Sequence, residues 1–282
     1  MDLAVLEQYS FTVTFVAFMV AAILYIVYLG YKNEKMAMVA TLATVIGFIS
    51  NTALLIIRWR ASGHAPFVNG FEFLVSFTWG ISAIYLLAEW RYKLKIIGAF
   101  VMPVAWLLLA YIAVIMPPEM KNAENLMPAL QSNWLTIHVA TAMVSYGAFA
   151  LSFGVSIMYL IKQSMENNKS RSDFNKRMPA LDVLDDISYK FIAVGFPLLS
   201  IVIISGAIWA EYAWGRYWSW DPKETWSLIT WLVYAAYLHA RFTFGWKGGR
   251  AAWMSILGFI FVLFTFFGVN YVLSGIHSYG KG

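Results

Sequence analysis

The sequence predicts an all-α integral membrane protein, a polytopic bundle of about eight transmembrane helices without a sizeable soluble domain. Composition gives the first indication, because hydrophobic residues make up 61% of the chain and charged residues only 12%. A soluble domain carries about 25% charged residues. The second indication is distribution, since the apolar residues gather into long stretches separated by short polar segments. We therefore treat residues 1–282 as a single membrane domain.

The predicted helices follow from stretch length, because a helix needs about 20 mainly apolar residues to cross a bilayer. Eight stretches are long enough or nearly so; the third is short. They cover residues 9–30, 37–57, 72–89, 96–116, 134–161, 187–212, 225–242 and 253–274. The first four form an N-terminal four-helix part over 1–130, and the others lie in 131–282. The charged segment 162–186 is predicted to be a surface loop.

Lysine and arginine are unevenly divided between the two sides of the predicted bundle. Segments after the first, third, fifth and seventh stretches hold 14 of them, and the remaining segments hold 6. Cytoplasmic loops of membrane proteins carry the excess of basic residues. We therefore expect both termini and the loop between the sixth and seventh stretches to lie outside. The same bias accounts for the net charge of +5 without nucleic-acid binding.

That outer loop is rich in tryptophan, and its sequence is Trp214-Gly-Arg-Tyr-Trp-Ser-Trp-Asp-Pro-Lys-Glu224. Six of the thirteen tryptophans lie between Trp209 and Trp231. An interfacial belt would explain one or two of them, but their concentration indicates a platform for a large, flat, mostly apolar ligand. The run Asp221-Pro-Lys-Glu224 is also a strong helix start. Its two carboxylates therefore need no ligand to explain them.

The chain has four histidines and no cysteine, so any thiol chemistry must use the thiols of another protein. Imidazole is a common ligand of haem iron. His138 and His277 come from different elements and are expected beside the tryptophan loop, as two axial ligands of one iron would be. His239 lies about 22 Å deeper along the seventh helix than Glu224. His64, in a Gly-His-x-Pro turn, has an open role.

Each histidine also fits a role without metal. A histidine near a helix end commonly forms interfacial hydrogen bonds, and Arg241 next to His239 allows both side chains to reach the membrane surface. Polar residues within apolar stretches, such as Asn51 and Asn270, are costly in lipid. They should therefore face the bundle interior or a polar cavity.

The tryptophan run resembles the "WWD" signature of membrane haem-handling proteins of cytochrome c maturation. Its continuation Thr225-Trp-Ser-Leu-Ile-Thr-Trp231, the run Tyr237-Leu-His-Ala-Arg241, and the surroundings of His138 and His277 resemble the system II members of the CcsA or ResC type. The similar segments span about 133–279, in the expected order. The N-terminal half fits more loosely, through residues 63–69 and Glu72.

The resemblance implies a haem-handling part over 131–282, with haem b as a transient ligand. His138 and His277 would hold the iron of an outer haem, and His239 that of a deeper haem shared with a partner of the CcsB, ResB or Ccs1 type. The outer haem would contact the tryptophan-rich loop 209–226, through Trp214, Trp218, Trp220, Asp221 and Trp226. No acid–base residue is implied.

The implied function is haem delivery across the membrane and covalent attachment to the Cys-x-x-Cys-His motif of apocytochrome c. The chain would act as part of a two-subunit holocytochrome c synthase. Thiol-reducing proteins of the same pathway and membrane lipid are further expected partners. A bacterial plasma membrane and a thylakoid membrane both suit such a protein.

Three other functions fit parts of the sequence. A haem transporter that passes haem to a separate ligase would use the same histidines. A dihaem electron-transfer cytochrome b would need paired histidines at matched depths, and His239 has no such partner in this chain. A structural membrane subunit without haem would keep the histidines as interfacial residues.

Overall fold

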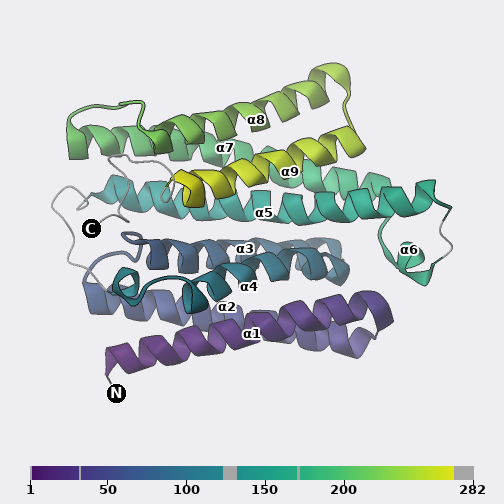
Figure 1. Ribbon diagram of the computed structural model, residues 1–282, viewed down its shortest axis with the longest axis horizontal. Helices are drawn as coiled ribbons and strands as arrows, with labels where there is room; N and C mark the ends of the chain where they lie inside the picture. The colour runs from purple at the N-terminus through teal and green to yellow at the C-terminus, as the bar shows by residue number, and fades with distance from the viewer. Residues whose placement is uncertain (1, 32, 123–131, 170–171, 270–282) are drawn as a thin grey trace.

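A computed structural model of the chain describes residues 2–31, 33–122, 132–169 and 172–269. Within these ranges the chain forms helices and turns and no β-strand. The long helices run side by side along the long axis of the molecule (Figure 1). The structure therefore confirms an all-α bundle.

The first part of the chain contributes four long helices. They are α1 (Leu3–Tyr31), α2 (Glu34–Ser62), α3 (Gly70–Tyr92) and α4 (Gly98–Val114), with the short 3-10 turns η1 (Lys95–Ile97) and η2 (Pro118–Lys121) before and after α4. Side chains mark where two of these helices begin. The Asn33 side chain accepts the N–H of Lys35, and that of Asn69 accepts the N–H of Glu72. Such caps satisfy backbone donors that the first helical turn leaves unpaired.

The second part supplies the remaining long helices. They are α5 (Asn133–Asn167), α7 (Leu181–Trp214), α8 (Pro222–Phe244) and α9 (Gly249–Leu263), and α9 continues into the π-helical turn η4 (Phe264–Gly268). The short helix α6 (Asp173–Arg177) lies between α5 and α7. The predicted surface loop 162–186 is thus partly helical. Ion pairs lie on the two flanking helices, between Lys162 and Glu166 of α5 at 3.1 Å and between Lys190 and Asp186 of α7 at 2.6 Å.

All eight predicted stretches coincide with helices over the described residues. In the part of the chain that the structure describes, seven helical segments are long and apolar enough to cross a membrane. Helix α8 is not one of them, although it has 23 residues and packs beside α7 and α9 (Figure 1). Its ends are polar, with Lys223 and Glu224 at one and Arg241 at the other. The fold is that of a polytopic membrane protein, and its orientation stays a prediction.

Helices α3 and α5 join the two parts of the chain through a close crossing. A Cβ atom on Gly147 of α5 would lie 2.6 Å from the carbonyl oxygen of Gly80 on α3, and one on Gly80 would collide with the Met143 carbonyl. Small residues let helix backbones approach closely in membranes, where packing rather than the hydrophobic effect holds helices together. This crossing brings the aromatic rings of Phe77 and Tyr146 to within 5.9 Å of each other.

Several polar side chains inside the bundle form hydrogen bonds within it, although the Asn51 Oδ1 and the Tyr234 hydroxyl have no partner among the described residues. Asn51, which the sequence predicts to face the interior, is fully buried and donates to the Val75 carbonyl at 3.2 Å and to the Thr78 hydroxyl at 3.1 Å. The hydroxyl of Ser152 bonds to that of Ser188 on α7 at 2.8 Å. These bonds avoid the cost of unsatisfied polar groups in lipid. Asn270 lies outside the described residues.

Candidate functional site

The loop between α7 and α8 is organised by the carboxylate of Glu224. It accepts the backbone N–H of Ser219 at 2.7 Å and that of Asp221 at 3.2 Å. In return, the Asp221 carboxylate accepts the N–H of Lys223 at 2.9 Å. The two acids form the capping box that the sequence predicts. Asp221 is buried as a helix cap, and its contact with a haem stays a prediction.

Four of the five tryptophans in 209–226 differ in exposure, two being exposed and two packed. Trp220 is 68% exposed and Trp214 is 37% exposed. Trp209, by contrast, is buried, and the Trp226 ring lies 4.2 Å from that of Phe264. Exposed indole faces are available to a flat ligand, while the packed ones hold the loop against the bundle.

Trp220 has an unusual backbone conformation for a large residue, with a φ angle of +59°. A left-handed conformation at such a residue costs on the order of 1–3 kcal/mol and persists only where the surroundings impose it. Here the bonds from Glu224 fix the preceding residues, and the Thr225 hydroxyl donates to the Trp220 carbonyl at 3.3 Å. Backbone strain of this kind clusters at functional sites.

Trp218 carries a buried indole N–H for which the described part of the chain offers no acceptor. The Trp218 and Trp220 rings meet edge to face, with centroids 5.7 Å apart. A buried donor without a partner costs about 1–3 kcal/mol. A ligand oxygen at this position would satisfy it.

Burial lowers the pKa of Lys223, which precedes the predicted membrane span, to about 8. The nearby Asp221 carboxylate opposes this shift. A lysine with such a pKa exchanges its proton close to physiological pH, so the positive charge beside the loop depends on pH.

His138 is held against α7 in one orientation. Its Nδ1 donates to the Val202 carbonyl oxygen at 2.7 Å, which places the ring proton on Nδ1 and the lone pair on Nε2. Metal-binding histidines commonly use this arrangement. The approach needs Gly206, because a Cβ atom there would lie 2.8 Å from Cε1 and 2.9 Å from Nδ1 of the ring.

His138 and the tryptophan loop share one end of the bundle, as the sequence predicts. Helix α5 begins, and α7 ends, at the left of the view in Figure 1. Gly206 precedes Trp214 by eight residues of α7, which corresponds to about 12 Å along the helix. His277, the predicted second ligand, lies outside the described residues.

His239 lies near the other end of α8. The helix is continuous from Pro222 to Phe244, so His239 is about 22 Å from Glu224 along the axis. Its ring is exposed and meets that of Phe244 edge to face at 5.7 Å. Arg241, two residues further on, binds both carboxylate oxygens of Asp185 on α7 at 2.6 and 3.0 Å.

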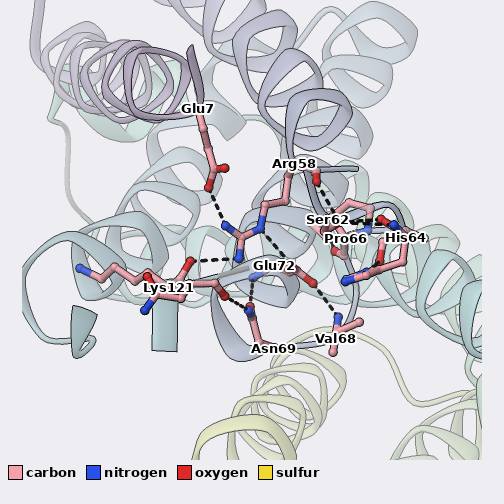
Figure 2. A network of polar contacts seen from close by, with 12 residues as sticks. Glu7, Arg58, Ser62, His64, Pro66, Val68, Asn69, Glu72 and Lys121 are labelled. Atoms are coloured by element: carbon pink, nitrogen blue, oxygen red, sulfur yellow. Dashed lines mark hydrogen bonds and ion pairs between the residues drawn. The ribbon is translucent and has the colours of Figure 1, made fainter. Parts of the chain in front are cut away.

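His64 belongs to a turn that is attached to a buried charge network, shown in Figure 2. The Ser62 hydroxyl donates to the His64 carbonyl at 3.0 Å, and the ring Nδ1 of His64 lies 3.0 Å from the Ala65 carbonyl. The same hydroxyl also donates to the Arg58 carbonyl oxygen at 2.9 Å. These contacts order the turn.

Arg58 is the centre of that network. It donates to the carboxylates of Glu7 at 2.8 Å and Glu72 at 2.9 Å, and to the Lys121 carbonyl at 3.0 Å. Arg58 and Glu72 are almost fully buried. The sequence does not predict these pairings; its one signal is that Arg58 is a basic residue on the side of the bundle that is poor in basic residues. The network joins α1, α2 and α3 to η2 near the tryptophan-loop end.

Within the described ranges, no cluster of three or more histidine, aspartate or glutamate side chains could hold a metal ion by itself. The site instead combines one oriented imidazole, exposed indole faces and a buried N–H donor. The fold therefore defines a polytopic membrane protein, and a binding site for a flat ligand at this end stays a prediction.

The comparisons with known proteins then give the family. The family described as "Cytochrome C assembly protein" matches residues 67–277. The chain is 44% identical over 254 residues to the "Cytochrome c biogenesis protein CcsA" of Guillardia theta, covering 84% of each chain. It is 42% identical over 269 residues to the protein of that name from Synechococcus elongatus, covering 81% of this chain and 83% of the other. The chain belongs to the cytochrome c assembly protein family, and its role lies in cytochrome c maturation.

A solved structure shares the fold. The "Cytochrome c Heme Lyase CcmF" superimposes with a TM-score of 0.69 at 16% sequence identity, over 95% of this chain and 47% of that one. The chain thus spans about half the length of that protein. At this identity the likeness concerns the fold alone.

Proposed function

We propose that the protein delivers haem across the membrane and presents it outside for covalent attachment to the Cys-x-x-Cys-His motif of apocytochrome c. It acts in this with a membrane partner of the CcsB or ResB type. The observation that carries the proposal is the oriented imidazole of His138 at the tryptophan-loop end. Names of relatives that include cytochrome c biogenesis support it.

At the outer site, Nε2 of His138 would bind the haem iron while the Val202 carbonyl holds the other ring nitrogen. His277 is proposed as the second axial ligand. Exposed faces of Trp214 and Trp220 would cover the porphyrin, and the buried N–H of Trp218 suits a haem carboxylate. A porphyrin held in this way is positioned for reaction, which can supply several kcal/mol of the barrier reduction.

The chemistry is an addition without a leaving group. Each cysteine S–H of the apocytochrome adds across one vinyl C=C, forming a C–S bond and a new C–H bond. Haem b supplies the vinyl groups, and the apocytochrome supplies both thiols, since this chain contains no cysteine. The part of this protein is to bind and orient the haem.

At the deeper site, His239 stands on an exposed face of α8. An exposed imidazole suits an iron whose second ligand comes from another chain, so the partner's histidine would complete the site. Haem would arrive there from the cytoplasm. We propose a bacterial plasma membrane or a thylakoid membrane as the location, with the tryptophan loop on the outer or lumenal side.

The test is reconstitution of this chain with its partner in lipid nanodiscs, with ferrous haem and a Cys-x-x-Cys-His peptide. We expect a thioether-linked product, measured by mass and by the pyridine haemochrome spectrum. A Ser-x-x-Ser-His peptide is the matched control. Haem transfer to the peptide or to an acceptor without thioether product would favour the transporter, and no haem binding would favour a structural subunit.

A further inference from the structure

A pocket of about 520 Å³ opens at the opposite end from the tryptophan loop, where α5 meets the turn between α8 and α9. The turn lies at the right of the view in Figure 1. Its lining includes Gln163, Phe244, Trp246, Lys247 and Arg250. No acidic side chain lines the pocket.

The pocket carries positive charge that its surroundings do not neutralise. Over the described residues, no ion pair involves Lys247 or Arg250. Nearby acidic groups are already engaged, because Asp185 binds Arg241 and Glu166 binds Lys162. Two unpaired cations with low-dielectric walls attract an anion.

Aromatic rings form part of the same wall. The Arg250 guanidinium lies 5.7 Å from the centre of the Trp246 ring, and Phe244 meets His239 edge to face at 5.7 Å. The aromatic side chains that line the pocket are therefore in contact with His239, through Phe244. Cations beside flat apolar faces suit a planar ligand that carries carboxylates.

Asp185 of α7 holds the turn that carries Lys247 and Arg250 in place. Besides binding Arg241, it accepts the backbone N–H of Gly248 at 2.9 Å. Lys247 and Arg250 flank that anchored residue, so their backbone is held at the rim of the pocket.

We propose that this pocket binds the two carboxylates of haem and places the porphyrin next to His239. The proposal rests on the proposed function, because haem is taken as the ligand of His239. It adds Lys247 and Arg250 as binding residues for the carboxylates, acting before or while the iron is bound.

The test uses iron-free protoporphyrin IX, which has the carboxylates of haem but cannot ligate histidine. Binding is followed by porphyrin fluorescence in nanodiscs of phosphatidylcholine. We expect the double variant Lys247→Gln/Arg250→Gln to bind at least about tenfold more weakly than the wild type. The dimethyl ester of protoporphyrin should bind both proteins equally. High salt should weaken wild-type binding toward that of the variant.

The double variant Lys35→Gln/Arg91→Gln is the matched control, since it removes two exposed positive charges that do not line the pocket. Equal binding of protoporphyrin IX to the pocket variant and the wild type would overturn the proposal. Equally weakened binding of protoporphyrin IX to the control variant would also overturn the proposal. If phosphatidylglycerol in the nanodisc displaces the porphyrin and abolishes the difference, the pocket is a lipid-phosphate site and the proposal is wrong.

A third variant separates this proposal from the proposed function. His239→Ala should leave protoporphyrin IX binding unchanged but remove the imidazole spectrum of the deeper ferric haem. If that spectrum does not depend on His239 while protoporphyrin IX still requires Lys247 and Arg250, the proposed role of His239 fails and the carboxylate site stands. If the spectrum depends on His239 but protoporphyrin IX binding does not require Lys247 and Arg250, only the proposed carboxylate site is overturned.

Discussion

The ring of His138 on α5 donates a hydrogen bond of 2.7 Å from Nδ1 to the carbonyl oxygen of Val202 on α7. This contact sets the tautomer and the direction of the imidazole before any ligand arrives. An imidazole that is already oriented loses little conformational entropy when it binds the iron, and this improves the affinity for haem. The relationship between these two residues is the structural basis of the proposed outer haem site.

Gly206→Ala should disturb that histidine without removing it. The added Cβ would lie 2.8 Å from the His138 ring, so the ring must leave its bond with Val202. We expect haem binding at the outer site to weaken by about tenfold or more, with loss of low-spin character in the absorption spectrum. Overpacking should also cost about 1–3 kcal/mol of stability.

Gly30→Ala is the control for this change, because a Cβ atom there would meet nothing within 4 Å. Added imidazole should restore the low-spin spectrum of the Gly206→Ala protein if only the histidine has moved. An unaltered spectrum without imidazole would show that His138 is not held by this contact.

Trp220→Gly should separate stability from binding. Glycine adopts a φ of +59° without the backbone strain that this angle imposes on tryptophan. The 68% exposed indole contributes little packing, so the melting temperature should stay the same or rise. Haem affinity should fall severalfold, as measured by titration. The control is Tyr217→Gly, at a neighbouring exposed position, which should leave haem affinity unchanged. A large fall in melting temperature for Trp220→Gly would contradict the presence of backbone strain at this residue.

Glu224→Ala should loosen the start of α8. The carboxylate accepts two backbone N–H groups, and loss of a helix cap costs about 0.5–2 kcal/mol. We expect a lower melting temperature and faster proteolysis within residues 214–224. Glu119→Ala, an exposed acid in η2, should change neither. Equal proteolysis of the two variants would argue against a capping role for Glu224.

Glu72→Leu should destabilise the tryptophan-loop end of the N-terminal helices. It leaves buried Arg58 without one of its two carboxylates and leaves the Val68 N–H without the acceptor it has at 2.8 Å. Removing one partner of a buried ion pair costs about 3–5 kcal/mol. Denaturant unfolding in nanodiscs measures the loss. Glu7→Gln should cost less, because Glu7 is 17% exposed, and a wild-type midpoint for Glu72→Leu would refute this account.

The helices were predictable because their determinants are local. Apolar stretches in the sequence located the long helices of the described residues, and the run from Asp221 to Glu224 predicted the start of α8 to the residue. Arg58 stands out in the sequence because it is a basic residue on the side of the bundle that is poor in basic residues. Its partners could not be found from the sequence, since Glu7 lies 51 residues away and Glu72 belongs to another helix.

The residues of the candidate site could be proposed from the sequence, but their geometry could not be predicted. Histidine and tryptophan positions along the chain placed His138 beside the loop. The orientation of its ring depends on Val202 and Gly206, which are ordinary apolar and small residues in a membrane helix. Likewise, nothing local predicts the left-handed conformation of Trp220 or the buried N–H of Trp218, because both depend on how the loop packs.

The most direct test of the account is the spectrum of the outer haem in a His239→Ala background, where the deeper site cannot ligate iron. Haem is added to the purified protein, and the ferric and ferrous absorption spectra are recorded with His138 intact or replaced by alanine. The account predicts a bis-imidazole low-spin spectrum that His138→Ala abolishes and external imidazole restores. A bis-imidazole spectrum that survives His138→Ala would contradict it.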